Sequence, residues 1–325
     1  MDGIATSAYI QCCRTAAFVL NSSKGECNMR IFLTGATGFI GSAIVTELIQ
    51  AGHQVRGLTR SEAGAQALIA AGAAVVRGDL DDLDSLRRGA AAADGVIHTA
   101  FNHDFSQFAA NCETDRQVIE AMGSALMGSN RPLIVTSTTG MGAITSGQPA
   151  TEDNFNPAHP NPRKASELAG VALAGCGVNV SVVRLPQVHD SVKQGLISPL
   201  IALAREKGVA AFVGDGRNRW PAVHISDVAR LYRLAVEKQQ AGRRYHAVAE
   251  EGIALRDIAE VIGRGLQVPL VSLSEDEAPA HFGWLSDFVR RDLPASGANT
   301  QDWLGWHPGG PGLIADLERM QYRSV

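Results

Sequence analysis

Short apolar runs alternate with longer amphipathic segments along the first half of the chain. Short runs of this kind are typical of strands that are buried on both faces of a parallel sheet. They predict strands at 31–33, 54–58, 73–76, 95–98, 132–136 and 180–184. Segments in which apolar residues recur with a helical period predict helices at 39–49, 62–71, 82–91, 105–127 and 163–174. Strands that alternate with helices in this order indicate an α/β fold with a doubly wound parallel sheet.

The regular alternation ends after Leu185. Beyond it we expect helices at 196–207, 226–238, 254–265 and 312–320, and short strands at 210–213, 244–248 and 268–273. The loops between them are longer. We therefore expect residues 29–185 to form the sheet domain, and residues 186–325 to form a smaller region that lies over the carboxyl edge of the sheet and partly returns to it.

The first 28 residues differ from the rest of the chain. They hold three of the five cysteines and precede the first predicted strand, and Met29 stands directly before that strand. We expect residues 1–28 to be a disordered extension or the product of a start codon placed too early. A packed extra element is the alternative.

A glycine-rich turn joins the first strand to the first helix. Its sequence is Thr34-Gly35-Ala36-Thr37-Gly38-Phe39-Ile40-Gly41. Gly35 permits a tight turn, Gly38 lets the backbone approach a pyrophosphate, and Gly41 lets the helix pack closely on the strand. The free N–H groups at the start of the helix would face the anion. This turn therefore predicts a dinucleotide-binding site of the Rossmann type.

Composition excludes several classes of partner. The 325 residues carry a net charge of −4 with no long basic run, so we expect no nucleic-acid partner. The sequence has no apolar stretch long enough for a membrane span, so we expect no membrane partner. The cysteines at 12, 13, 27, 112 and 176 lack metal-binding spacing, and their scatter fits a protein of the reducing cytoplasm with no metal site.

From Met29 onward the chain resembles the short-chain dehydrogenase/reductase superfamily, in its extended, epimerase-like branch. The resemblance rests on motifs that follow one another in the order typical of that superfamily. They are Gly35 to Gly41, Gly78-Asp79-Leu80, His98-Thr99-Ala100, Val135-Thr136-Ser137-Thr138, Arg184-Leu185-Pro186, Gly214-Asp215-Gly216 and Val223-His224-Ile225-Ser226-Asp227. The resemblance implies a small-molecule substrate and suggests a homodimer.

The resemblance also assigns roles to single residues. Asp79 and Leu80 would border the adenine, and Thr99 and Ala100 would line the path to the nicotinamide. Pro186 and Val188 would lie near the nicotinamide carboxamide. Thr138, with Ser137 beside it, falls where the superfamily places the hydroxyl that hydrogen-bonds the reacting oxygen. Thr37, Phe39 and Ile40 complete the predicted cofactor-binding turn.

The end of the second strand indicates which cofactor is bound. A site for NAD would place an Asp or Glu there to accept a hydrogen bond from the ribose 2′-hydroxyl. This chain has Arg60 and Ser61 instead, a guanidinium and a hydroxyl that suit a 2′-phosphate. Glu62 would repel that phosphate if its side chain pointed inward. We therefore expect NADP, with NAD as the alternative.

The superfamily's Tyr-x-x-x-Lys pair is missing. Where that pair should stand, Arg163 takes the place of the tyrosine and Glu167 that of the lysine. An arginine stays protonated near neutral pH, so Arg163 cannot shuttle a proton. Because the two residues are four apart on a helix, they could pair with each other, or Arg163 could contact the substrate. Lys164 is the nearest replacement for the lysine, although it is turned about 100° around the helix.

Two interpretations of function remain open. The first is an NADP-dependent oxidoreductase or epimerase in which Thr138, Ser137 and Arg163 are the candidate catalytic residues. Water or a histidine would then supply the proton, the candidates being His98, His103, His189 and His224. The second is an NADP(H)-binding sensor that kept the pocket and lost the chemistry.

Overall fold

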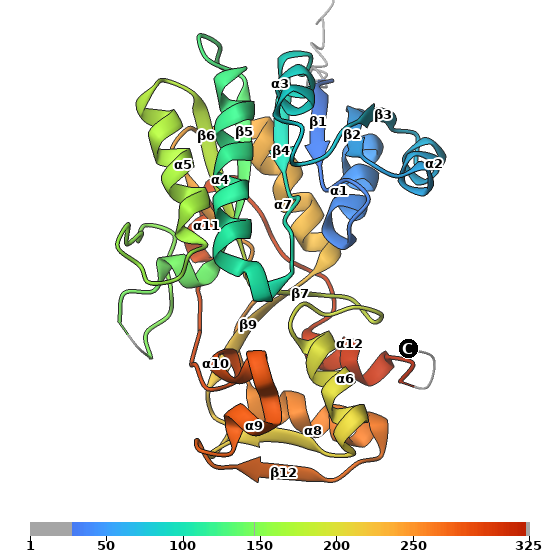
Figure 1. The fold of residues 1–325 in the computed structure, drawn as a ribbon, viewed down its shortest axis with the longest axis vertical. Helices are drawn as coiled ribbons and strands as arrows, with labels where there is room; N and C mark the ends of the chain where they lie inside the picture. Colours follow the sequence, from blue (N-terminus) through green and yellow to red (C-terminus); the bar gives the residue numbers. More distant parts are fainter. Residues whose placement is uncertain (1–27, 146, 323–325) are drawn as a thin grey trace, which may run out of the picture.

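A computed structural model describes residues 28–145 and 147–322. Its centre is a seven-stranded sheet in the order β10-β6-β5-β4-β1-β2-β3, with every neighbouring pair parallel (Figure 1). The strands are β1 (Arg30–Thr34), β2 (Gln54–Thr59), β3 (Ala74–Arg77), β4 (Gly95–His98), β5 (Pro132–Thr138), β6 (Asn179–Leu185) and β10 (Arg244–His246). The predicted doubly wound parallel sheet is confirmed.

Helices cover both faces of this sheet because the side chains of each strand alternate between them. In β1, Ile31 and Leu33 enter the core with α1 (Phe39–Gln50) and α7 (Ile225–Lys238). Phe32 enters the opposite core with α3 (Leu83–Ala91), α4 (Phe108–Ser124) and α5 (Lys164–Gly175). Helix α2 (Glu62–Ala70) joins β2 to β3, and α11 (Ala298–Leu304) contacts α7 and β10.

The remaining elements form a lower lobe beyond the carboxyl edge of the sheet (Figure 1). One three-stranded sheet joins β7 (Gln187–His189), β9 (Arg219–His224) and β11 (Glu250–Ala254), and a parallel pair joins β8 (Ala210–Val213) to β12 (Leu270–Leu273). The helices of this lobe are α6 (Ile197–Lys207), α8 (Leu255–Leu266), α9 (Ala278–Phe282), α10 (Ser286–Val289) and α12 (Leu313–Arg319). β7 directly follows β6, so the lobe starts where the nicotinamide end of a cofactor would lie.

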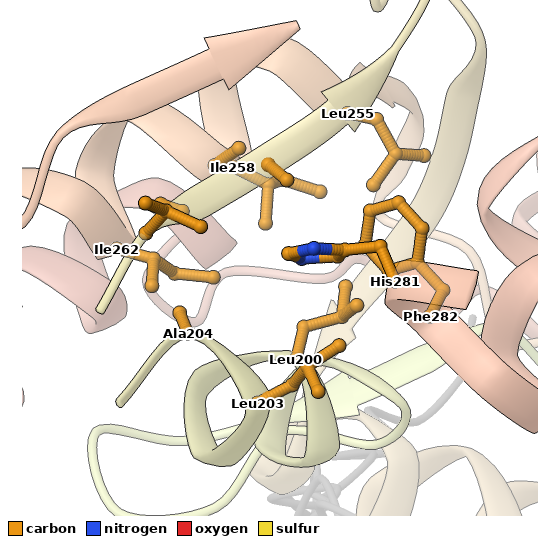
Figure 2. A pocket seen from close by; sticks show the side chains of 12 residues that line it. Leu200, Leu203, Ala204, Leu255, Ile258, Ile262, His281 and Phe282 are labelled. Atoms are coloured by element: carbon orange, nitrogen blue, oxygen red, sulfur yellow. The ribbon is translucent and has the colours of Figure 1, made fainter. Parts of the chain in front are cut away.

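The core of the lower lobe is closed. Figure 2 shows Leu200, Ile258 and His281 around a gap between α6, α8 and α9. The space between them is about 10 Å³, which is room for at most one water molecule. This gap is therefore a packing feature rather than a ligand site.

Most predicted elements form within a few residues of their expected ends. The long helix expected at 105–127 is shorter, because a 3₁₀ turn at Phe105–Gln107 precedes α4 and α4 ends at Ser124. The structure has elements that the sequence did not predict, namely β7, β9, β11, α9 and α10 in the lower lobe and α11 beside α7 and β10. The prediction for residues 1–28 lies outside the described residues except for its last position. No helix in the described ranges combines the length and the apolarity needed to cross a bilayer.

Candidate functional site

The glycine turn has the geometry of a cradle for a dinucleotide. Gly35 has a φ of +69°, and a Cβ on it would lie 2.7 Å from the Ala100 nitrogen and from Thr99 Oγ1. A Cβ on Gly41 would lie 2.0 Å from the Gly35 carbonyl oxygen, so only glycine lets α1 pack on the turn. Gly38 is the N-cap of α1 and bears no side chain to obstruct the N–H groups of the helix start. The residues present therefore fit the cofactor that the turn predicts.

Other predicted cofactor residues gather at the same edge of the sheet. Thr99 follows β4 and donates a hydrogen bond from Oγ1 to the Thr34 carbonyl at 2.8 Å, which fixes the Thr99-Ala100 backbone beside Gly35. Asp79 follows β3, and its carboxylate accepts from the Asp81 and Asp82 N–H groups at 3.0 Å. Pro186 and Val188 lie between β6 and the end of β7. Thr37 is exposed, whereas Phe39, Ile40 and Leu80 are half-buried.

The end of β2 is positively charged. Arg60 is exposed, and the Ser61 hydroxyl accepts from the Gly64 N–H at 3.0 Å as the N-cap of α2. Arg77, at the end of the neighbouring strand β3, binds the Glu62 carboxylate and donates to the Ser61 carbonyl at 2.8 Å. Because Glu62 is held by Arg77, its charge is compensated next to Arg60.

Arg163 is part of a buried polar network. Its Nη1 donates to Asp115 Oδ2 at 2.7 Å and its Nη2 donates to the Thr136 carbonyl at 3.0 Å. The same Asp115 carboxylate accepts from Ser166 at 2.6 Å and contacts His98 Nε2 at 3.0 Å. Burial alone would raise the pKa of Asp115, but the Arg163 guanidinium and the His98 hydrogen bond outweigh burial and hold it at about 2.

Glu167 belongs to a second buried network. Its carboxylate accepts two hydrogen bonds of 2.8 Å from Arg184 and one of 3.0 Å from Arg244. Arg184 also donates to the Thr151 and Asn154 carbonyls, so it ties the loop after β5 to β6. Glu167, which the sequence analysis sets at the expected lysine position, is therefore part of a buried structural ion pair. The pair expected between Arg163 and Glu167 is replaced by contacts of each with other partners.

The side-chain hydroxyls of Ser137 and Thr138, at the end of β5, differ in how far their residues are exposed. Thr138 is half-buried and lies opposite Leu185 in the pairing of β5 with β6, which sets it beside Pro186. Ser137 is 4% exposed and faces the other side of the sheet. Its hydroxyl has no hydrogen-bond partner among the described residues. Of the two, Thr138 is the one that can reach a substrate.

Tyr232 is held inside the core of the sheet domain. Tyr232, on α7, is fully buried and its hydroxyl lies 2.6 Å from Thr136 Oγ1. Because Thr136 donates its own proton to the His98 carbonyl at 2.6 Å, the Tyr232 hydroxyl must be the donor of the pair. Burial raises the pKa of Tyr232. This tyrosine stabilises the sheet core.

Three of the four candidate histidines are held in structural contacts. His98 is fully buried between Thr34 and Asp115, and His189 is fully buried beside Asp316. His224 Nδ1 lies 2.8 Å from the Ser226 hydroxyl. His103, in contrast, lies in the exposed loop after β4, with its ring 5.3 Å from that of Phe101. Desolvation lowers the pKa of His103, and the charges of Arg163 and Lys193 lower it further.

Lys193 is a residue of this edge that the sequence analysis missed. Its ammonium lies 5.6 Å from the centre of the Phe39 ring, on the glycine turn. The tight loop after β7 presents it, since the Asp190 carboxylate accepts from the Val192 and Lys193 N–H groups at 2.7 Å. The sequence signal for this turn was Asp190, because an Asp side chain accepts hydrogen bonds from backbone N–H groups that follow it in a turn. Nothing in the sequence revealed that this turn meets the glycine turn.

A pocket of about 290 Å³ opens next to the end of β5. It is lined by residues of 140–145 and 148–150, of 156–160, and of 292–294. Gly140 of this lining stands two residues after Thr138. No group of three or more His, Cys, Asp or Glu side chains suited to a metal ion occurs within residues 28–145 and 147–322.

Comparisons with known proteins give the same fold. The chain is 49% identical to an uncharacterized protein of Schizosaccharomyces pombe over 90% of this chain and 100% of that one. It is 43% identical to an uncharacterized protein of Saccharomyces cerevisiae over 89% of this chain and 98% of that protein. It is 26% identical to a UDP-glucose 4-epimerase of Streptomyces lividans over 91% of this chain and 96% of that protein.

A solved structure confirms the architecture. The dTDP-glucose 4,6-dehydratase DesIV of Streptomyces venezuelae, crystallised with NAD, superposes with a TM-score of 0.72 at 21% identity, over 91% of this chain and 96% of that one. The model of the NAD dependent epimerase/dehydratase family matches residues 31–249. The turn, the sheet order and these matches agree, and the chain belongs to the NAD-dependent epimerase/dehydratase family.

Proposed function

We propose that the chain is an NADP(H)-dependent oxidoreductase that interconverts a small carbonyl compound and its alcohol. The observation that carries this proposal is the glycine cradle at the carboxyl edge of the sheet. Gly35 and Gly41 have no room for a side chain, and Thr138 ends β5 at the same edge, one strand beyond β4. A cofactor held in the cradle would supply or accept the hydride, and the chain's own residues would orient the carbonyl.

The charge at the end of β2 supports NADP rather than NAD. Arg60 is exposed just after β2, where it would meet a 2′-phosphate, and Glu62, on α2, is bound by Arg77. Lys193 adds a positive charge above Phe39, where it would neutralise the pyrophosphate.

Thr138 would position the substrate oxygen. A hydroxyl at this site donates one hydrogen bond to the oxygen and stabilises the alkoxide that forms on reduction. Arg163 would act as a positioning residue, because its guanidinium is occupied by Asp115 and the Thr136 carbonyl. His103 is the histidine best suited to give the proton, since it lies in the exposed loop two residues beyond Phe101.

The test measures the turnover of a panel of aldehydes and ketones from the loss of NADPH absorbance. It compares the wild-type protein with variants at Thr138. We expect Thr138→Ala to lower kcat by roughly 10²-fold with NADPH binding unchanged. Thr138→Ser keeps the hydroxyl and is expected to retain most of the activity. Tight NADPH binding with no turnover of any compound would instead favour the sensor.

A further inference from the structure

We propose that Arg163 is a positioning residue for His103 and acts through the ring of Phe101. The guanidinium is fixed from inside the protein, one of its faces carries the Phe101 ring, and that ring contacts the imidazole of His103. The inference rests on the proposed function, because His103 is the proton donor proposed there. It explains what an arginine that cannot exchange its own proton contributes to the site.

The guanidinium of Arg163 is held in one orientation. Its two Nη atoms donate to different buried acceptors, Asp115 Oδ2 at 2.7 Å and the Thr136 carbonyl at 3.0 Å. Its backbone N–H donates to Asn161 Oδ1 at 2.8 Å, at the N-cap of α5. The side chain is 10% exposed. Because a planar group held at two of its nitrogens cannot rotate freely, the protein core sets the direction of its two faces.

The same network reaches the glycine turn. Asp115 Oδ1 lies 3.0 Å from His98 Nε2, and His98 Nδ1 lies 2.6 Å from the Thr34 hydroxyl. Thr34 is the last residue of β1 and the first of the glycine turn. All three side chains are buried. This chain of hydrogen bonds therefore fixes Arg163 relative to the cradle proposed for the cofactor.

Phe101 lies on one face of the guanidinium. The Arg163 Cζ atom is 4.0 Å from the centre of the Phe101 ring, which is a close cation–π contact. Phe101 directly follows Thr99 and Ala100, the residues expected to line the path to the nicotinamide. The contact therefore anchors the chain where it leaves β4 and passes the proposed site.

His103 lies between two anchors of the segment after β4. Its ring meets the Phe101 ring edge-on at 5.3 Å, and it lies 6.3 Å from the Phe105 ring on its other side in the sequence. Phe105 stacks on Trp284 of the lower lobe at 4.7 Å. The contact of Phe101 with Arg163 at one end and the stack on Trp284 at the other restrict the position of the imidazole between them.

The charges that act on His103 are positive. Desolvation lowers its pKa, the Arg163 guanidinium lowers it further, and so does the Lys193 ammonium from the loop after β7, while a backbone hydrogen bond opposes the shift. The neighbouring Asp104 turns its carboxylate to the Ser106 N–H and hydroxyl, at 3.0 and 2.6 Å. Loosening the segment would return water to the imidazole and move it away from Arg163. Both changes would raise the pKa of His103 towards 6.5.

Phe101→Leu tests the link without breaking the buried ion pair. It removes the ring from a half-buried position and leaves Asp115 paired with Arg163. The pKa of His103 is measured in the free protein by NMR titration of the imidazole signals, which His103→Gln assigns. We expect that pKa to rise towards 6.5, the pH midpoint of kcat for NADPH-dependent reduction to rise with it, and kcat to fall about tenfold or more. Phe101→Tyr keeps the ring and is expected to restore most of the kcat.

A second variant tests the arginine itself. Arg163→Lys keeps a positive charge beside Asp115 but lacks the planar group that supports the Phe101 ring. We expect it to lower kcat as Phe101→Leu does, with NADPH affinity unchanged, and we expect the double variant to lose no more than either single one. Circular dichroism and thermal unfolding confirm that each variant is folded.

Trp303→Leu is the matched control. Trp303, on α11, is half-buried, and its ring lies 4.1 Å from the Arg243 guanidinium, so this change also removes a ring from an arginine. It should leave kcat, its pH midpoint and the pKa of His103 unchanged.

An unchanged titration of His103 in Phe101→Leu would overturn the inference and leave an oxidoreductase in place. Losses of kcat that add up in the double variant would overturn it too, because the two side chains would then act separately. A protein that binds NADPH and reduces nothing would remove the proposed function alone. The titration of the free protein needs neither NADPH nor turnover, so it still decides whether Arg163 and Phe101 position His103.

Discussion

Arg163 donates to Asp115, 48 residues upstream on α4, at 2.7 Å, and not to Glu167 one turn along its own helix. Helix α5 is thereby fastened to α4 at its N-cap. Both partners are buried, with 10% and 2% of their side chains exposed. Removing one partner of such a pair leaves the other charged and unpaired in the interior.

Asp115→Asn is therefore expected to destabilise the protein by about 3–5 kcal/mol, measured as the free energy of unfolding in urea. Glu113→Gln is the control, because Glu113 lies on the same helix with an exposed side chain, and stability should barely change. The pKa of Asp115 is lowered to about 2, so its contribution is complete above its ordinary pKa of 3.8 and is lost as the pH falls towards 2. An Asn variant as stable as wild type at pH 7 would contradict the ion-pair role.

Replacing Glu167 by lysine is expected to disrupt the buried network around Arg184. Glu167→Lys would place a third positive charge against Arg184 and Arg244, in a site where Glu167 and Arg184 are fully buried. We expect little soluble, folded protein, judged by circular dichroism and thermal unfolding. Lys164→Glu, the opposite change at the neighbouring residue, should fold normally. A well-folded Glu167→Lys protein would show that the two arginines can separate.

Arg60→Ala is expected to weaken NADPH binding about tenfold or more and to leave NADH binding nearly unchanged, because only NADPH carries the 2′-phosphate. Fluorescence titration with both nucleotides checks this. Arg87→Ala, on the exposed surface of α3, should change neither affinity. Equal losses for the two nucleotides would place Arg60 away from the 2′-phosphate.

Gly41→Ala is expected to abolish cofactor binding and to lower stability, because the added methyl group would lie 2.0 Å from the Gly35 carbonyl oxygen. Gly175→Ala is the matched control in the last turn of α5, where nothing lies within 4 Å of the added carbon. That change should be neutral or slightly stabilising. Thermal unfolding with and without NADPH measures both effects, and a Gly41→Ala protein that still binds NADPH would contradict the packing role.

His103 should give the reductase a specific pH dependence. Its pKa is lowered from the ordinary value of 6.5, so a donor at this position loses its proton as the pH rises through a midpoint below 6.5. We expect kcat for reduction to fall over that range in wild type. In His103→Gln the low-pH rate should drop and this step of the profile should vanish. An unchanged profile in the variant would assign the proton to solvent.

The sequence predicted the fold well where local patterns decide it. Runs such as Ile31-Phe32-Leu33 carry apolar side chains to both faces of the sheet, and this requires burial between two helical layers. Strand β9 was missed because Pro221 interrupts the pattern of a strand, and the strand forms through its pairing with β7 and β11. The close packing at Gly35 and Gly41 follows from the local geometry of the turn, and the roles of the three glycines at a cofactor stay predictions.

The partners of Arg163 and Glu167 could not be predicted from the helix that carries both. Each side chain is bound by residues from other elements, Asp115 on α4 and Arg184 on β6. A partner on the same helix and a partner on another element are chemically equally suitable for Arg163 and for Glu167. The tertiary packing determines which of them each side chain contacts. Lys193 was missed for the same reason, because it meets Phe39 across 154 positions of sequence only after β7 has formed.

Helix α7 covers part of one face of the central sheet, and this has a consequence for protein synthesis. Residues Leu231 and Tyr232 of α7 cover Ile97, Ile134 and Val183 on one face of the central strands. The ribosome delivers β6 before α7, since the lower-lobe segments up to β9 intervene. A nascent chain at that stage holds six of its sheet strands, with α1 on this face but the part that α7 covers still exposed and open to aggregation. We expect a fragment that ends at residue 185 to be recovered in inclusion bodies.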